Sequence, residues 1–216
     1  MLIVDEIKPY LKILIVINFV LILSLFCFFR TELLILNLIF LLFTSFLGMF
    51  FRDPERNTQS SPEEIISPAD GKIIKIDQVF ESEHLKSNAT RVSIFMSIFN
   101  VHVNRSPVSG KIEFIKDYPG NYFSAFKDKA SLSNEQTHFG ISGKDDKVFL
   151  KLIAGLIARR IVVWKNKGEY IKAGEKIGMI RFGSRAEVYL MENYILQVKK
   201  GDKVKAGITV IAKANS

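Results

Sequence analysis

The segment Gly201-Asp202-Lys203-Val204-Lys205-Ala206-Gly207 gives the clearest sign of how the second part of this chain folds. The same frame occurs earlier, at Gly168-Glu169-Tyr170-Ile171-Lys172-Ala173-Gly174. Each copy has a glycine, polar or acidic residues, an apolar residue and then Lys-Ala-Gly. Glycine permits a tight turn with a positive φ, and the apolar residue is expected to point inward. The repeated frame predicts short strands joined by glycine turns.

The residues around these two segments have the same character. Short apolar and β-branched runs alternate with Gly, Pro, Asn and Asp, which is typical of an antiparallel sandwich or barrel. The expected strands are Lys72–Val79, Arg91–Phe99, Gly110–Ile115, Val148–Ile153, Ile161–Trp164, Ile177–Phe182 and Ala186–Met191. The segment Asp117–Phe139 has no period and is expected to be a long loop. A helical stretch is considered only near Ala154–Arg160.

The repeated frame resembles the strand–turn pairs of biotinyl/lipoyl-type hybrid barrels. A carrier function does not follow, because no Met-Lys-Met or Asp-Lys-Ala acceptor lies in a hairpin turn. We therefore expect a mainly β protein, with an antiparallel hybrid-barrel or sandwich domain over residues 57–216.

The first part of the chain is different in composition. It contains two apolar runs, Ile13–Phe29 and Leu33–Phe51, separated by the short polar segment Arg30-Thr31-Glu32. About 20 apolar residues span a bilayer as a helix, and about 17 is the lower limit. We expect a hydrophobic helical hairpin over residues 1–56 that associates with the membrane.

Lys8 and Lys12 precede the first run, and Arg52 and Arg56 follow the second, which places both flanks and the β domain on the cytoplasmic face of the cell membrane. Shallow insertion into one leaflet is an alternative to spanning. A hairpin buried inside a globular core is disfavoured because neither run has a polar face. A signal peptide is disfavoured by the acidic residues near the start.

The composition excludes several classes of protein. The chain has 216 residues, 30 Lys+Arg, 22 Asp+Glu and a formal charge of +8, all of which is carried from Arg52 onward. One cysteine, Cys27, excludes an intramolecular disulfide framework and a metal site made of several cysteines, and three histidines without a helical pair argue against a zinc enzyme. Nucleic-acid binding is disfavoured because no clustered basic stripe or recognition motif is present.

Three short segments carry the residue types that catalysis uses. They are Ser67–Lys72, which contains Asp70, Phe99–Pro107, which contains His102, and Arg181–Arg185, which contains Gly183 and Ser184. Each one alone is more simply explained as a turn or a structural histidine. The other two histidines, His84 and His138, are expected at the surface.

Taken together and in this order, these segments resemble the phosphatidylserine decarboxylase family in its short bacterial and archaeal form. The resemblance covers nearly the whole chain and also includes Phe51–Arg56 and Ile153–Ile161. It implies a proenzyme that cleaves itself between Gly183 and Ser184 into a β chain, 1–183, and an α chain, 184–216, which stay together as a heterodimer.

The resemblance also implies the chemistry. Ser184 Oγ attacks the carbonyl of Gly183, with His102 as base and Asp70 orienting it. Elimination and hydrolysis then turn Ser184 into a covalent pyruvoyl cofactor. Its ketone forms a Schiff base with phosphatidylserine, and loss of CO₂ leads to phosphatidylethanolamine. No metal or external cofactor is implied.

Some points differ from longer members of the family or stay open. Phe99 stands where longer members carry a second histidine, and Arg185 where they carry threonine. The proton donor to the decarboxylated carbon is unassigned. Arg159 and Arg160 are candidates for the lipid phosphate.

Two other functions remain alternatives. One is a membrane-bound serine hydrolase using Ser184, His102 and Asp70, although the Gly-x-Ser-x-Gly elbow is missing. The other is a non-catalytic, membrane-anchored hybrid-barrel module. Of the three functions, only the decarboxylase requires the chain to break.

Overall fold

The computed structural model describes residues 3–28, 30–121, 133–143, 147–155, 160–181 and 184–215, with the backbone alone for 26–28. The chain divides into two compact units, Met1–Glu55 and Arg56–Ser216, and each is considered by itself.

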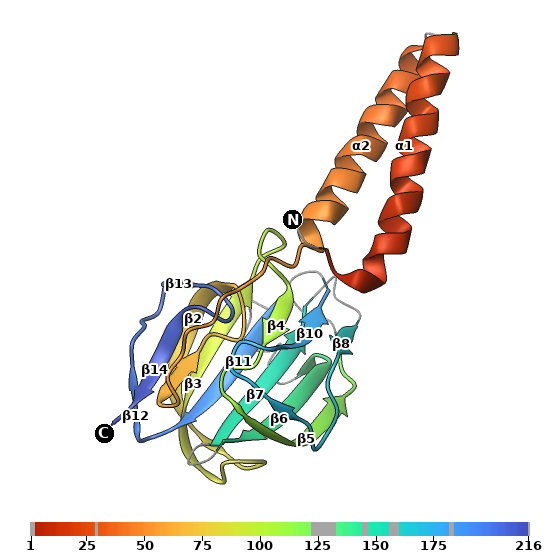
Figure 1. The fold of residues 1–216 in the computed structure, drawn as a ribbon. Coiled ribbons are helices and arrows are strands. Elements are labelled where there is room, and N and C mark those ends of the chain that lie inside the picture. Colours follow the sequence, from red (N-terminus) through yellow and green to blue (C-terminus); the bar gives the residue numbers. More distant parts are fainter. Residues whose placement is uncertain are drawn as a thin grey trace. The chain divides into compact units, whose positions relative to one another are not determined.

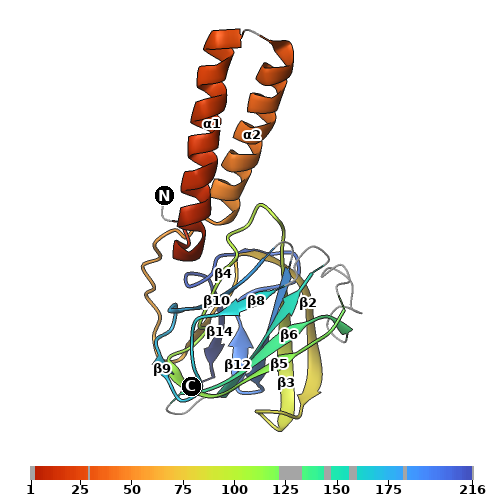
Figure 2. The ribbon, with the colours of Figure 1, turned by 90° about the vertical axis from the view of Figure 1, so that its right-hand side faces the viewer.

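The described part of the first unit consists of a short 3-10 turn, η1 (Asp5–Ile7), and two helices, α1 (Lys8–Phe28) and α2 (Thr31–Phe50). The helices lie side by side as a hairpin (Figures 1 and 2). Asn18 Nδ2 donates across the hairpin to Thr44 Oγ1 at 2.8 Å. Both helices are long and apolar enough to cross a membrane. The expected helical hairpin is confirmed.

The second unit is built from antiparallel strands, which confirms the mainly β expectation. The strands are β1 (Glu64–Ile66), β2 (Gly71–Glu81), β3 (Ser87–Met96), β4 (Val103–Arg105), β5 (Gly110–Tyr118), β6 (Gln136–Ser142), β7 (Lys147–Ala154), β8 (Ile161–Val163), β9 (Tyr170–Ile171), β10 (Lys176–Ile180), β11 (Ser184–Met191), β12 (Tyr194–Leu196), β13 (Lys203–Val204) and β14 (Val210–Ala214).

Within the described residues the strands form one large curled sheet and two small ones. The large sheet has the order β13-β2-β3-β11-β7-β6-β5-β9, and the small sheets have the orders β1-β14-β12 and β4-β10-β8. Figure 1 shows β2, β3, β11, β7, β6 and β5 following one another around the curl. Alternate residues of the large sheet, such as Val92, Leu150 and Val188, pack with Ile65 and Ile211 of a small sheet in one apolar core.

The strand order contains an internal two-fold repeat. The four strands counted from one edge of the large sheet are equivalent to the four counted from the other edge. Thus β13, β2, β3 and β11 correspond to β9, β5, β6 and β7. The small sheet β1-β14-β12 corresponds to β4-β10-β8 in the same way. Bulges occur at matching places, between Ile73 and Lys75 in β2 and between Ile112 and Phe114 in β5.

Sequence and hydrogen bonds support this correspondence. Ser67-Pro68-Ala69-Asp70-Gly71-Lys72-Ile73 aligns with Ser106-Pro107-Val108-Ser109-Gly110-Lys111-Ile112. Ile73 N–H donates to Asp202 O, and Ile112 N–H donates to Glu169 O, each at 2.9 Å. The glycines of the repeated frame have positive φ in both copies, which confirms the predicted turns; they are Gly168, Gly174, Gly201 and Gly207.

One half is inserted into the other. The strands from β4 to β10 form one continuous half, whereas the other half is β1–β3 followed, after that insertion, by β11–β14. A short segment, 143–146, joins β6 to β7 in the inserted half. In the other half the equivalent strands β3 and β11 are separated by the whole insertion, although Met96 and Ser184 are paired.

Two expectations about the segment Asp117–Phe139 and its histidine are wrong. The expected long loop contains the end of β5 and the start of β6, while 122–132 lie outside the described residues. His138, expected at the surface, is 4% exposed. β6 was not predicted because its outward-facing positions carry polar side chains, such as Gln136 and His138, that are nevertheless buried. His84 is half-buried, and its Nε2 contacts Ile141 O.

The turn between β2 and β3 covers this polar face. His138 Nδ1 bonds to Glu83 Oε1 at 2.9 Å, and Tyr118 donates to Glu83 Oε2 at 3.0 Å. Burial lowers the pKa of His138, and the nearby Lys151 ammonium lowers it further, against the opposing effect of Glu83. Burial likewise lowers the pKa of His84. Protonation of both imidazoles is therefore less favourable in the folded protein than in the unfolded chain.

The lowered histidine pKa values predict that stability falls on mild acidification. Below about pH 6.5 the unfolded chain takes up protons that the folded state resists, so stability rises with pH across this window. His138→Gln removes one such group. We expect its melting temperature to fall less than that of the wild type between pH 7.5 and pH 5. The comparison uses detergent-solubilised full-length protein. If the melting temperatures of both proteins fall by the same amount between pH 7.5 and pH 5, the prediction is wrong.

Candidate functional site

Ser184 is the first residue of β11 and lies between two neighbouring strands. It pairs with Met96 at the end of β3 and with Ala154 at the end of β7, and it is fully buried. Its hydroxyl donates to Met96 Sδ at 3.2 Å. A thioether sulfur is a weak acceptor, so this contact holds the hydroxyl only loosely. Gly183, the expected partner in cleavage, lies outside the described residues.

His102 is fully buried just before β4. Its Nδ1–H donates to Asn100 O at 3.0 Å, which leaves the lone pair of the neutral imidazole on Nε2. The backbone carbonyl of His102 accepts from Ile180 N–H at the end of β10. The imidazole is therefore oriented by a backbone carbonyl, in the tautomer whose Nε2 can accept a proton.

Asp70 does not make the expected contact with His102. Its carboxylate accepts from Arg56 NH2 at 2.9 and 3.2 Å and from the Ala206 N–H at 2.7 Å. A guanidinium carries a permanent charge and binds a buried carboxylate more strongly than a neutral imidazole does. The expectation that Asp70 orients His102 is corrected accordingly. Arg56 was noted in the sequence only as a flank of the apolar run.

Of the two candidate phosphate ligands, Arg159 lies outside the described residues. Arg160 is exposed and immediately precedes β8. Because Ile161 pairs with Ile180, Arg160 lies near the end of β10, where Arg181 follows. An exposed guanidinium in this position remains accessible to an anionic headgroup.

Two residues that the sequence did not single out connect the three segments. Asn104, in β4, directs Nδ2 toward Pro68 O at 3.4 Å and toward Met96 Sδ at 3.7 Å. Met96 also accepts the Ser184 hydroxyl. The segments containing Asp70, His102 and Ser184, far apart in the sequence, therefore meet around Met96 and Asn104. No sequence pattern indicates this role, since both residues also fit ordinary strand positions.

Comparisons with known proteins show the family of the chain. The family model for phosphatidylserine decarboxylase matches residues 43–212. The chain belongs to the phosphatidylserine decarboxylase family. Its matched segment contains Asp70, His102, Arg160 and Ser184.

Three similar proteins, each named phosphatidylserine decarboxylase proenzyme, show how far the similarity extends. The protein of Desulfotalea psychrophila is 45% identical over 182 residues, 83% of this chain and 84% of its own length. That of Syntrophus aciditrophicus is 50% identical over 165 residues, 76% and 78% of the two chains. The protein of Oleidesulfovibrio alaskensis is 49% identical over 175 residues, which is 81% of this chain and 80% of its own length. This is a family of decarboxylating enzymes.

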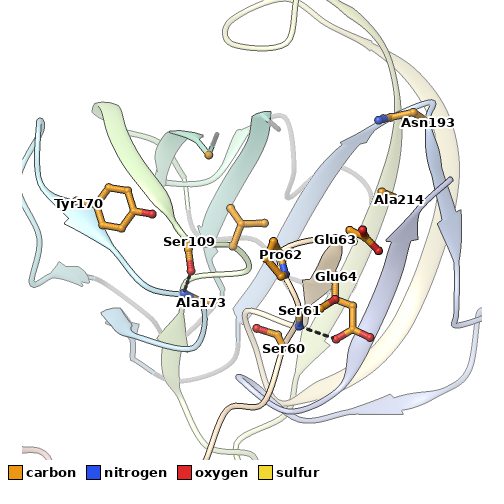
Figure 3. Close-up of a pocket in the computed structure, with 12 residues that line it drawn as sticks. Ser60, Ser61, Pro62, Glu63, Glu64, Ser109, Tyr170, Ala173, Asn193 and Ala214 are labelled. Atoms are coloured by element: carbon orange, nitrogen blue, oxygen red, sulfur yellow. Dashed lines mark hydrogen bonds between the residues drawn. The ribbon is translucent and has the colours of Figure 1, made fainter. Parts of the chain in front are cut away.

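A cavity of about 670 Å³, drawn in Figure 3, is lined by residues of both halves and contains the counterparts of two residues of the predicted site. It is lined by Ser109, which corresponds to Asp70, and by Glu63, which corresponds to His102. The Ala173 N–H donates to Ser109 Oγ at 2.9 Å, as the Ala206 N–H donates to Asp70. The surroundings of Ser184 and their counterpart in the repeat therefore carry different side chains at equivalent positions.

The buried ion pair predicts a strong stability effect at Arg56. The side chains of Arg56 and Asp70 are 10% and 11% exposed. Arg56→Met leaves a buried carboxylate without its cation, which costs about 3 kcal/mol, or roughly 6–12 °C in melting temperature for a chain of this size. Lys205→Met removes an exposed positive charge nearby and is expected to change stability by at most about 0.5 kcal/mol.

A double variant makes this test specific. Arg56→Met combined with Asp70→Asn leaves no unpaired charge and is expected to melt above Arg56→Met alone. If the single variant and the Lys205→Met control melt at the same temperature, the ion pair does not contribute as argued.

Proposed function

We propose that this protein converts phosphatidylserine to phosphatidylethanolamine with a pyruvoyl group that it makes from Ser184 by cleaving the Gly183–Ser184 bond. The observation that carries the proposal is the placement of Ser184. Its hydroxyl is buried, is held only by a weak acceptor, and lies at the meeting point of the segments that match the decarboxylase family. The proenzyme names of the relatives support processing.

Cleavage begins with the hydroxyl of Ser184. Its oxygen bonds to the carbonyl carbon of Gly183, and the hydroxyl proton goes to a base. The bond from that carbon to the nitrogen of residue 184 then breaks, the nitrogen takes the proton from the base, and the amide becomes an ester. Loss of the α-proton of residue 184 expels the Gly183 carboxylate and leaves dehydroalanine, which takes up water and releases ammonia. His102 suits the role of base because its Nδ1–H is occupied by Asn100 O, leaving Nε2 as the proton acceptor.

The sheet explains how the products stay together. The proposed α chain, 184–216, supplies β11–β14, and these strands pair with β1, β2, β3 and β7 of the proposed β chain. The new end at residue 184 remains between Met96 and Ala154. The two chains form one heterodimer without requiring any new contact.

The buried site suits the proposed cofactor. The pyruvoyl group supplies a ketone that condenses with the substrate amine and a conjugated system that accepts the electrons left by CO₂. Met96 and Ala154 give it apolar neighbours that exclude water, and Arg160 offers a cation to the lipid phosphate. The proton donor to the product carbon is not assigned.

The hairpin provides the proposed attachment to the membrane. The helices α1 and α2 have 21 and 20 residues, about the length that crosses a hydrocarbon core. The cationic flanks support a catalytic unit on the cytoplasmic face. Such an anchor keeps the enzyme at the surface that contains its lipid substrate.

Processing is tested by the intact mass of the denatured protein. Wild-type protein is expected as two chains of 183 and 33 residues, the smaller beginning with pyruvoyl in place of serine. Ser184→Ala has no nucleophile and is expected as one unbroken chain of 24.6 kDa. Ser93→Ala removes another buried hydroxyl of the same sheet and is expected to mature.

The role of His102 is tested in the same experiment. His102→Ala is expected to accumulate as an unbroken precursor because the Ser184 proton has no acceptor. Normal maturation of this variant would exclude His102 as the base. An unbroken wild-type chain with a free Ser184 would instead favour the hydrolase or the non-catalytic module.

Membrane attachment is tested by alkaline carbonate extraction. Leu38 and Leu42 are exposed on α2, and each arginine placed near the centre of a spanning helix costs about 2.5–3.5 kcal/mol. Leu38→Arg with Leu42→Arg is expected to release the protein from the membrane fraction. Phe80→Arg changes an exposed apolar residue of β2 and should stay membrane-bound. Retention of the double variant would contradict anchoring through α2.

A further inference from the structure

The two halves of the repeat allow the site to be compared with its own counterpart. Asn104 in β4 corresponds to Ile65 in β1, and each lies at a shift in register of its small sheet. Both side chains are fully buried. The fold therefore accepts an apolar side chain at this position, and the inserted half carries an amide instead, next to Ser184 of the other half.

The amide of Asn104 is only partly satisfied. Its Nδ2 faces two acceptors, Pro68 O and Met96 Sδ. Its Oδ1 is buried and has no hydrogen-bond partner among the described residues. A buried polar atom without a partner destabilises a protein, so stability gives no reason for asparagine here.

The position of the amide connects it with the reaction. Asn104 Nδ2 and Ser184 Oγ both contact the sulfur of Met96. The carboxamide is therefore separated from the reacting residue by a single atom. Because Pro68 O can only accept, the nitrogen of the amide faces it and the oxygen is the atom left for a ligand.

We propose that Asn104 Oδ1 binds the amine of the phosphatidylserine headgroup and positions it at residue 184. An unsatisfied acceptor requires a donor, and the ammonium is the group of this headgroup that donates. The carboxylate and the phosphate accept only. The inference rests on the proposed function, because it assigns a residue to the amine that the pyruvoyl ketone would receive.

The test exchanges the two corresponding residues. Asn104→Ile places the residue of the other half in the site, and Asn104→Asp keeps an acceptor oxygen of the same size. Both are first checked for cleavage by intact mass and for the pyruvoyl ketone by reaction with phenylhydrazine. We expect both to mature, and Asn104→Ile to melt no lower than the wild type.

The decisive measurement is decarboxylation of phosphatidylserine in mixed micelles. We expect kcat/KM of Asn104→Ile to fall roughly 100-fold and that of Asn104→Asp to stay within about tenfold of the wild type, since a carboxylate also accepts from an ammonium. The rate with phenylhydrazine should be unchanged in both variants, because this neutral reagent does not need a bound ammonium. Ile65→Asn, the reciprocal change, should lower the melting temperature and leave kcat/KM unchanged.

Several outcomes would overturn the proposal. They are wild-type kcat/KM in mature Asn104→Ile, an equal loss in Asn104→Asp, or a parallel loss of phenylhydrazine reactivity. Failure of Asn104→Ile to mature would place the residue in processing instead. A wild-type protein without a pyruvoyl group would show that the proposed function itself has failed, and the proposal would fall with it.

Discussion

The pairing of β11 with strands on both of its edges is the constraint on which the site depends. β3 and β7 both pair with β11 from its first residue, and this pairing fixes the register of Ser184. The ladder continues along the strand to Met191 on the β3 side. The small sheet β4-β10-β8 then brings His102 and Asn104 to the same end. A reacting group at the start of a fully paired strand is positioned more accurately than one on a loop.

The insertion of one half into the other explains why a break at this point would be tolerated. A hairpin requires a continuous chain between its strands, as between β6 and β7. The strands β3 and β11 are instead paired across a long insertion, from β4 to β10, that folds as the second half of the repeat. Their pairing does not depend on a tight local connection. Opening the chain next to Ser184 would therefore leave the sheet intact.

Local chemistry determined which features the sequence could predict. The hairpin and the glycine turns follow from composition and backbone freedom, and both are confirmed. β6 was missed because His138 and its neighbours are polar yet buried under the turn between β2 and β3. The contact of Asp70 with Arg56 depends on how distant segments meet, which no periodicity encodes. The similarity of Ser67–Ile73 to Ser106–Ile112 was not recognised from the sequence, because the strand order is what shows that these segments are equivalent.

The comparison of the halves also bears on Asp70. The neutral hydroxyl of Ser109 accepts the Ala173 N–H in one half, so a turn of this kind needs no charge. Asp70 performs the same task with a carboxylate that must be compensated by Arg56. A buried ion pair adds little net stability over a neutral arrangement. The charge is therefore better explained by the chemistry at this end of the sheet, which supports a role for Asp70 in the proposed processing although it does not contact His102. Asn104 is a parallel case, because its counterpart Ile65 shows that the fold does not require a polar side chain at this position.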